Sequence, residues 1–276
     1  MSAPVAVCDP RVGGYGYIPS LAAGIVFPIL FGLLTLYSLY LSFRKRLWYL
    51  TISIGGLLEF LGWIARAVAH TAVCSSDMFI MQITCLIVGP VFWSATLYVI
   101  LGVLITHAPE RSVLPGKLYL IIFSCIDLLS LILQAAGGGI AAGAQTIDVQ
   151  DRGTNIMVAG VFVQIAGMTA FVVLGLIFIS RVWSQRHAYG IRNSVLLVVV
   201  TSSLLIFLRN IYRCVELLEG WTGHLNVTEG FIIGLDAVPM VLCLTTLCFL
   251  GHHDQDGLLD RGLPSEEKHE HSSISS

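Results

Sequence analysis

Charged residues are scarce in this chain. Asp, Glu, Lys and Arg together make up 12% of its 276 residues, and the formal net charge is −2. Only three lysines occur, at Lys45, Lys117 and Lys268. So few cations cannot form the strongly basic field that nucleic acid requires. We therefore expect no nucleic-acid partner.

Several patterns that carry chemistry are also missing. The chain has no Gly-x-x-x-x-Gly-Lys-Ser/Thr loop, so transport would have to be downhill or ion-coupled rather than driven by ATP hydrolysis. A zinc hydrolase inside the bilayer would need several intramembrane histidines. Here the histidines near apolar runs lie in loops or at run ends: His70, His107, His187, His224, His252 and His253. We expect no metal, no cofactor and no enzymatic activity.

Hydrophobic residues, by contrast, make up 56% of the chain, and the mean hydropathy is +0.84. A helix of about 20 apolar residues crosses roughly 30 Å of hydrocarbon. Such runs occur seven times, so the sequence predicts an all-α, polytopic membrane protein with seven transmembrane helices. The predicted spans are residues 17–41, 48–70, 78–106, 117–140, 154–180, 192–216 and 229–250.

The distribution of Lys and Arg between the loops predicts an orientation. Eight of these residues fall on one side of the seven runs and two, Arg11 and Arg152, on the other. By the positive-inside rule the N-terminus lies outside and the C-terminus in the cytosol. The prediction divides the chain into an extracellular segment (1–16), a transmembrane domain (17–250) and a disordered cytosolic tail (251–276).

Two covalent features would lie on the predicted outer side. Cys8 and Cys74 could form a disulfide there, where oxidation is permitted, and free thiols are the alternative. Asn226 begins an Asn-Val-Thr glycosylation sequon, although its closeness to the seventh run could prevent its use.

Polar residues inside the predicted spans are the candidates for a site. In the sixth run Arg209, Tyr212, Arg213 and Glu216 recur at helical spacing and share one face. That face must avoid lipid, because a charge at the bilayer centre costs roughly 2.5–3.5 kcal/mol. The other candidates are Glu59, Arg66, Gln82, Asp127, Gln134, Gln164 and Asp236.

Comparing depths across the alternating runs puts most of these charges in the outer half, which predicts a polar chamber that opens outward. A cationic amine would sit against Glu59, Asp127 or Asp236. A phosphate or carboxylate would prefer the arginines. The alternative is an ion-pair network that only fixes which helix packs where.

These residues also resemble a known family, the fungal RTA-like lipid-translocating exporters, over most of the membrane region. The resemblance rests on Tyr17-Ile18-Pro19-Ser20, the stretch Glu59 to Arg66, Gln82 followed by Gly89-Pro90 and Ala95, Asp127 with Gln134 and Gly137, Gly160 with Gln164, Arg209 to Glu216 with Glu219 and Gly220, Glu229, and Asp236 to Met240. It implies export of sphingoid long-chain bases, resistance to toxic amphiphiles and, in some relatives, porphyrin or haem handling.

Residues and resemblance together predict a transporter of amphipathic lipids, with sphingoid long-chain bases as the first candidate and the plasma membrane as its location. Its partners would be membrane lipids and an amphipathic small molecule. A seven-helix lipid or stress sensor without flux stays open, as does porphyrin or haem handling. A retinal protein is excluded, because no lysine lies in the seventh run to form the Schiff base.

Overall fold

The computed structural model describes residues 17–44, 49–72, 75–144, 146–184, 189, 191–220 and 223–253. In this part of the chain every regular element is helical and none is a strand. The elements are α1 (Leu21–Arg44), α2 (Tyr49–Ala69), α3 (Ser76–His107), η1 (Pro109–Arg111), α4 (Gly116–Ala142), α5 (Ile147–Val182), α6 (Asn193–Glu219), α7 (His224–Val227), α8 (Glu229–Phe231), η2 (Ile232–Ala237) and α9 (Val238–His253).

Seven of these helical segments are long and apolar enough to cross a membrane. The prediction of an all-helical chain with seven candidate spans is therefore confirmed. The fifth helix is the main difference in length, because α5 begins at Ile147 rather than at residue 154. Its first turns are polar, and a search for apolar runs does not count them. Orientation stays a prediction, and the segments 1–16 and 254–276 lie outside the described residues.

The seventh span is not a regular α-helix. Glu229–Leu250 runs through α8, η2 and α9, and η2 is a π-helix in which Val238 N–H bonds to the carbonyl of Ile233. Pro239 follows directly and has no N–H to donate, so the regular i→i−4 ladder cannot continue through it. The wider turn changes the angular position of the side chains around the helix. Asp236 lies in this segment and is buried.

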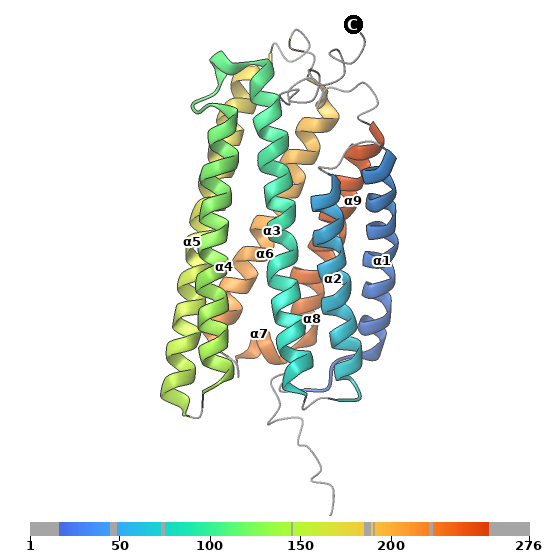
Figure 1. Cartoon of the computed structure of the whole chain (residues 1–276), viewed down its shortest axis with the longest axis vertical. Helices are drawn as coiled ribbons and strands as arrows, with labels where there is room; N and C mark the ends of the chain where they lie inside the picture. The colour runs from blue at the N-terminus through green and yellow to red at the C-terminus, as the bar shows by residue number, and fades with distance from the viewer. Residues whose placement is uncertain are drawn as a thin grey trace, which may run out of the picture.

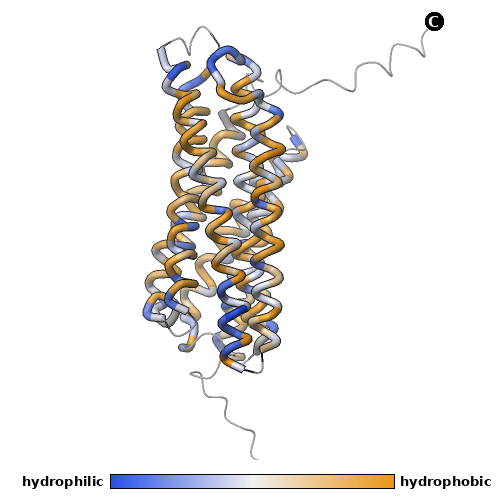
Figure 2. Tube along the Cα trace, turned by 90° about the vertical axis from the view of Figure 1, so that its left-hand side faces the viewer, coloured by the Kyte–Doolittle hydropathy of each residue, from blue (hydrophilic) through white to orange (hydrophobic). Residues whose placement is uncertain are grey.

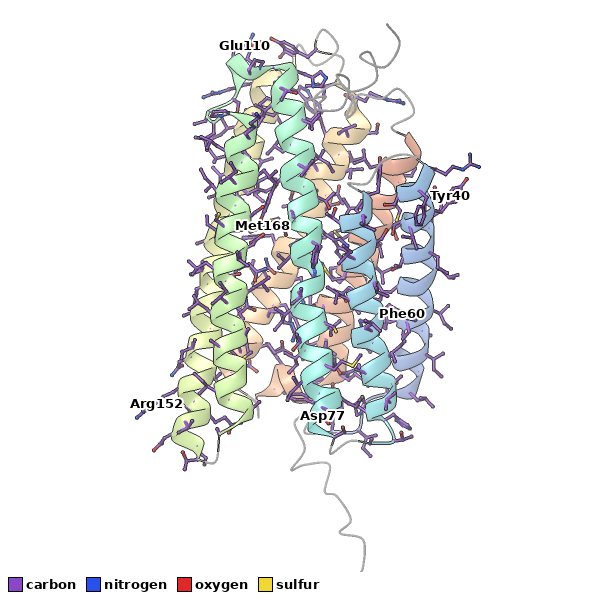
Figure 3. All side chains as sticks on the ribbon, viewed as in Figure 1. Tyr40, Phe60, Asp77, Glu110, Arg152 and Met168 are labelled. Atoms are coloured by element: carbon purple, nitrogen blue, oxygen red, sulfur yellow. The ribbon has the colours of Figure 1, made fainter. Side chains whose placement is uncertain are left out.

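The spans form a closed ring in which each packs against its neighbours in sequence (Figure 1). The closing contact is between α9 and α1. We call one end of the bundle the α7 end; it holds α7, the start of α1 and, as Figure 3 shows, Asp77 and Arg152. The opposite end, with η1 and Glu110, is the η1 end. Apolar residues cover most of the length between the two ends (Figure 2).

Glycines allow the closest helix contacts. A Cβ built on Gly55 of α2 would lie 2.4 Å from the indole nitrogen of Trp93 and 2.7 Å from the carbonyl oxygen of Gly89, both on α3. A Cβ on Gly137 of α4 would lie 2.5 Å from the carbonyl oxygen of Gly153 on α5. Small residues of this kind let backbones approach in membranes, where packing holds helices together. These contacts fix how α2, α4 and α5 present their polar side chains.

Candidate functional site

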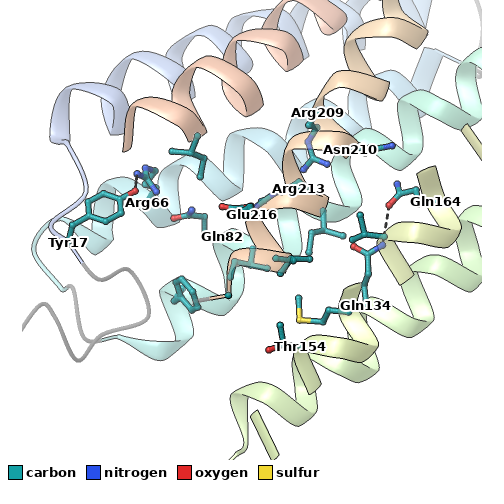
Figure 4. A pocket seen from close by; sticks show the side chains of 18 residues that line it. Tyr17, Arg66, Gln82, Gln134, Thr154, Gln164, Arg209, Asn210, Arg213 and Glu216 are labelled. Carbon is teal, nitrogen blue, oxygen red and sulfur yellow. Dashed lines mark hydrogen bonds and ion pairs between the residues drawn. The ribbon is translucent and has the colours of Figure 1, made fainter. Parts of the chain in front are cut away.

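A pocket of about 810 Å³, part of it open to the outside, lies in the half of the bundle nearest the α7 end (Figure 4). Its wall comes from α2, α3, α4, α5 and α6, together with Tyr17 and Ile232. Polar residues are concentrated in that wall despite the apolar bundle around it. They are Tyr17, Arg66, Gln82, Gln134, Thr154, Gln164, Arg209, Asn210, Arg213 and Glu216.

Arg209 links three helices at the inner end of this wall. Its Nε lies 2.7 Å from Oδ1 of Asp236 on η2. Its Nη2 donates a hydrogen bond to the carbonyl of Leu86 on α3. That carbonyl would normally accept from residue 90, but residue 90 is a proline and has no N–H. The guanidinium therefore supplies the donor that Pro90 removes, and it also neutralises the buried acid that the π-helix presents.

Arg213 and Glu216 form the second ion pair of the wall, one turn further along α6. Arg213 Nη1 lies 2.7 Å from Oε2 of Glu216, and its Nη2 lies 3.8 Å from Oδ2 of Asp236. The Tyr212 hydroxyl donates to the other oxygen of Glu216 at 3.3 Å. Tyr212 does not itself line the pocket. Its hydroxyl helps hold the Glu216 carboxylate in place.

Glu59 on α2 does not line the pocket, but its carboxyl group lies close to these ion pairs. The side chain is 1% exposed and contacts α3 at Gly89, where an added Cβ would lie 3.3 Å from its Cγ. It is close enough to interact electrostatically with Asp236, Arg209 and Arg213. Its Oε1 is buried and has no hydrogen-bond partner among the described residues. Three carboxyl groups, those of Glu59, Asp236 and Glu216, thus face two guanidinium groups.

Arg66 belongs to a separate cluster at the mouth of the pocket. Its Nη2 lies 2.8 Å from Oε1 of Glu229 and donates to the Tyr17 hydroxyl at 2.5 Å. The Glu229 carboxylate also accepts the backbone N–H of Ser20, at 2.9 and 3.1 Å to its two oxygens. The residues that precede α1 are therefore tied to α2 and to the start of the seventh span. The acid that pairs with Arg66, Glu229, was not among the predicted site residues.

Amide side chains form the opposite side of the pocket. Gln134 on α4 donates its Nε2 hydrogen to Oε1 of Gln164 on α5, at 3.1 Å. Gly160 makes room for this pair, since a Cβ there would lie 2.8 Å from Cγ of Gln134. Gln82 on α3 also lines the pocket and is buried. These groups offer both donors and acceptors without adding charge.

Asp127 lies in a different environment. Its Oδ2 accepts a hydrogen bond from the Tyr98 hydroxyl at 2.9 Å, and Tyr98 packs edge-on against Phe171. Asp127 has no ion pair within the described part of the chain and does not line the pocket. The structure therefore separates Asp127, one of the three acids predicted to meet a cationic amine, from both the arginines and the pocket.

Seven of the predicted site residues line the same pocket: Arg66, Gln82, Gln134, Gln164, Arg209, Arg213 and Glu216. Glu59, Asp127, Tyr212 and Asp236 lie outside its lining. Sequence reasoning missed Tyr17, Thr154, Asn210 and Glu229. Two of them could have been found from the sequence: Asn210 is an amide within the sixth run, and Glu229 is an acid at the predicted depth of Arg66. Tyr98, the partner of Asp127, could not, because nothing in the sequence pairs a tyrosine of the third run with that acid.

The predicted covalent features are not tested. Cys8 and Cys74 lie outside the described residues, and Asn226 falls in α7, where its side chain is not described. Among the residues that the structure describes, no group of three or more His, Cys, Asp or Glu side chains is placed to hold a metal ion.

Comparisons with known proteins identify a family and several relatives. The family model described as "RTA1 like protein" matches residues 52–254, most of the chain. The chain belongs to this family. It is 30% identical over 272 residues to the sphingoid long-chain base transporter RSB1 of Saccharomyces cerevisiae, covering 84% of this chain and 71% of that protein. No solved structure was found to match.

Two further yeast relatives have names that state no activity. Protein RTM1 of Saccharomyces cerevisiae is 31% identical over 200 residues, covering 70% of this chain and 64% of that protein. Protein RTA1 of the same organism is 25% identical over 260 residues, covering 83% and 81%. The predicted family is therefore confirmed. Together with seven apolar helices, it identifies an integral membrane protein whose relatives include a lipid transporter.

Proposed function

We propose that this protein moves amphipathic lipids across a membrane, with sphingoid long-chain bases as the first substrate class and the plasma membrane as its location. The name of the relative RSB1 supports the substrate class. The structure supports a binding site for a polar headgroup at the pocket near the α7 end. A long-chain base combines an amine and hydroxyl groups with one apolar chain, so it needs an acid, several hydrogen-bonding groups and an apolar surround.

The observation that carries this proposal is the position of Glu216 in the pocket wall. It is the carboxylate that the pocket presents together with three arginines. Two of those arginines, Arg66 and Arg209, already face the acids Glu229 and Asp236. A protonated amine would approach Glu216 and share it with Arg213, while amides such as Gln82 and Gln134 would meet its hydroxyl groups.

The sequence alone favoured Glu59 and Asp127 for the amine. In the structure both lie outside the pocket lining, so we now assign the first contact to Glu216 and treat Glu59 as a buried carboxyl group close to the pocket wall. Its buried Oε1 has no hydrogen-bond partner among the described residues, so it could accept a hydrogen bond from an amine that moves deeper. Transport would then pass the amine from the pocket wall toward α2.

Flux into proteoliposomes tests the proposal. Purified protein is reconstituted, a labelled long-chain base is added, and its transfer between leaflets is followed with the unmodified protein and with Glu216→Gln. We expect about a tenfold loss of flux in the variant, since a hydrogen bond to a charged group contributes roughly 1.5–3 kcal/mol. Glu219→Gln is the matched control, because Glu219 lies one turn further along α6, is exposed and does not line the pocket.

The outcomes of this assay distinguish transport from sensing and identify the residue that contacts the amine. Absence of flux with the unmodified, folded protein refutes transport of this lipid class and favours a sensor. Normal flux in folded Glu216→Gln refutes the assignment of the amine to that residue. Faster transfer of a phosphorylated base than of the amine would show that the arginines select an anionic headgroup. The same measurement on Glu59→Gln, Asp127→Asn and Asp236→Asn tests whether those acids take part.

A further inference from the structure

A second opening lies between α5 and α6, closer to the η1 end than the polar pocket. It encloses about 380 Å³, part of it open to the outside, and is lined almost wholly by apolar atoms. Its floor is formed by buried side chains that include Leu101, Phe171 and Val199. Leu176 and Leu204 line it as well and are about half exposed, at 48% and 51%. The opening is therefore a crevice whose rim faces the surroundings of the bundle, where lipid would lie.

The crevice and the polar pocket follow the same pair of helices. On α5 the pocket is lined at Gln164 and the crevice at Gly175, which is three turns further and about 16 Å away at the rise of an α-helix. On α6 the corresponding positions are Asn210 and Val199. The apolar tails of one leaflet span about half of the 30 Å hydrocarbon core, or about 15 Å. An amphiphile with its headgroup in the pocket could therefore reach the crevice with its tail.

The space beside Gly175 distinguishes the crevice from ordinary packing. Gly175 has only Leu101 Cδ2 within 4 Å of an added Cβ, at 3.5 Å, so the helices leave space there that a side chain could occupy. Ser203 lines the crevice, is 4% exposed, and its Oγ has no hydrogen-bond partner among the described residues. Serine in a membrane helix commonly bonds to its own backbone. Here Oγ makes no such bond and is itself buried, so an alkyl tail, which has no hydrogen-bonding atom, gains nothing from it.

The segment between the two openings can adapt. Met168 on α5 and Ile206 on α6 lie at helical spacing between the lining residues of the pocket and those of the crevice, and both are buried. Methionine has an unbranched, flexible side chain that fills irregular gaps and changes shape readily. A flexible side chain at this position lets the packing between the pocket and the crevice adjust to a bound tail.

We infer that the α5–α6 crevice binds the alkyl tail of the lipid whose polar headgroup occupies the pocket. Gly175 keeps the crevice open, because it has no side chain to fill it. The rim at Leu176 and Leu204 gives the tail a sideways route from the bilayer. This inference takes the class of lipid from the proposed function, but the crevice itself does not depend on transport.

Photolabelling tests the inference on the full chain in lipid nanodiscs. One probe is a long-chain base with a diazirine near the methyl end of its tail, and a second carries the diazirine beside the amine. Labelled peptides are identified by mass spectrometry. We expect the tail probe to label α5 around residues 171–179 and α6 around residues 199–204. The headgroup probe should label residues that line the polar pocket.

Substitution of Gly175 supplies the matched pair of variants. Gly175→Leu fills the crevice and should reduce labelling by the tail probe about tenfold, the effect of losing about 1.4 kcal/mol of binding. Gly175→Ala adds a methyl group at an ordinary contact distance and should label within about twofold of the unmodified protein.

The inference is overturned if the tail probe labels residues that do not line the crevice, a result that needs no variant to fold; labelling of Leu101 on α3 counts as crevice labelling. It is also overturned if folded Gly175→Leu labels like Gly175→Ala. Crevice labelling without flux would refute the proposed transport and leave the tail site standing. Flux without crevice labelling would refute the tail site and leave the proposed transport standing.

Discussion

Replacing Arg209 with methionine should destabilise the bundle strongly, because this guanidinium pairs with the Asp236 carboxylate and donates a hydrogen bond to the Leu86 carbonyl. Met has similar length and good helix propensity, so the change removes the charge and donors with little effect on α6 itself. Asp236 would be left with Arg213, whose Nη2 lies 3.8 Å from it. The carbonyl of Leu86 would lose the donor that stands in for Pro90.

The magnitude follows from the geometry of the pair. Opposite unit charges 2.7 Å apart attract by about 6 kcal/mol at an effective dielectric constant of about 20. Desolvation offsets part of this, and removing one partner of a buried pair typically costs 3–5 kcal/mol. The lost interhelical hydrogen bond adds about 0.6 kcal/mol on the average measured in a membrane protein. We expect Arg209→Met to lower the free energy of unfolding by about 4 kcal/mol.

The assay is unfolding by sodium dodecyl sulfate in mixed micelles, followed by tryptophan fluorescence. Two second substitutions separate the two roles of Arg209. Asp236→Asn in the Arg209→Met background removes the stranded charge and should recover about 2 kcal/mol. Pro90→Ala in the same background restores a backbone donor to Leu86 and should recover about 0.6 kcal/mol.

A loss below about 1 kcal/mol in Arg209→Met would refute this reasoning, because it would place the pair among weakly coupled surface ion pairs. Strictly additive losses in Arg209→Met with Asp236→Asn would refute it as well, since residues in direct contact must show coupling. Glu59→Gln is the internal control. It removes a buried carboxyl whose Oε1 has no hydrogen-bond partner in the described part of the chain, so stability should change by less than about 1 kcal/mol.

Three further changes test other contacts in the same unfolding assay. Gly55→Ala should lower the free energy of unfolding by about 1–3 kcal/mol, because the added methyl group would overlap α3. Gly234→Ala is the control and should cost less than about 0.5 kcal/mol, because nothing lies within 4 Å of the added carbon. Equal effects of the two substitutions would contradict the close contact at Gly55. Tyr98→Phe should cost about 0.6 kcal/mol by removing the hydrogen bond to Asp127, and a gain in stability would show that the bond is not formed. Glu229→Gln should lower the free energy of unfolding by about 1–3 kcal/mol, because the buried guanidinium of Arg66 would lose its anionic partner. An unchanged free energy of unfolding would mean that water replaces the carboxylate.

Local periodicity explains how much of the site was readable from the sequence. Of the four residues predicted to share one face of the sixth run, Arg209, Arg213 and Glu216 line the pocket and Tyr212 does not. Spacing along one helix fixes direction around its axis. Gln134 and Gln164 were also identified as interior residues, since an amide in a membrane helix avoids lipid. These deductions need nothing beyond the helix on which each residue lies.

Pairing between helices was not readable in the same way. Arg66 bonds to Glu229, Asp127 to Tyr98, and Glu59 Oε1 has no partner in the described residues. The depths predicted from the sequence, with most charges in the outer half and Glu59 and Asp127 near the midplane, did not give these pairings. Depth gives only one coordinate of a side chain. The rotation of each helix about its axis and its place in the ring supply the others.

The sequence by itself therefore determined that the chain is helical, that seven segments can cross a membrane and which side chains avoid lipid, because each follows from hydropathy and a local period of 3.6 residues. Only the tertiary structure decided that Glu216, rather than Glu59 or Asp127, lies in the pocket wall. It also decided that Arg209 meets both Asp236 and the carbonyl freed by Pro90. The physical reason is that such contacts depend on two helices at once. Here they also depend on Pro90, which leaves the Leu86 carbonyl without its usual donor, and on the π-helical turn that contains Asp236.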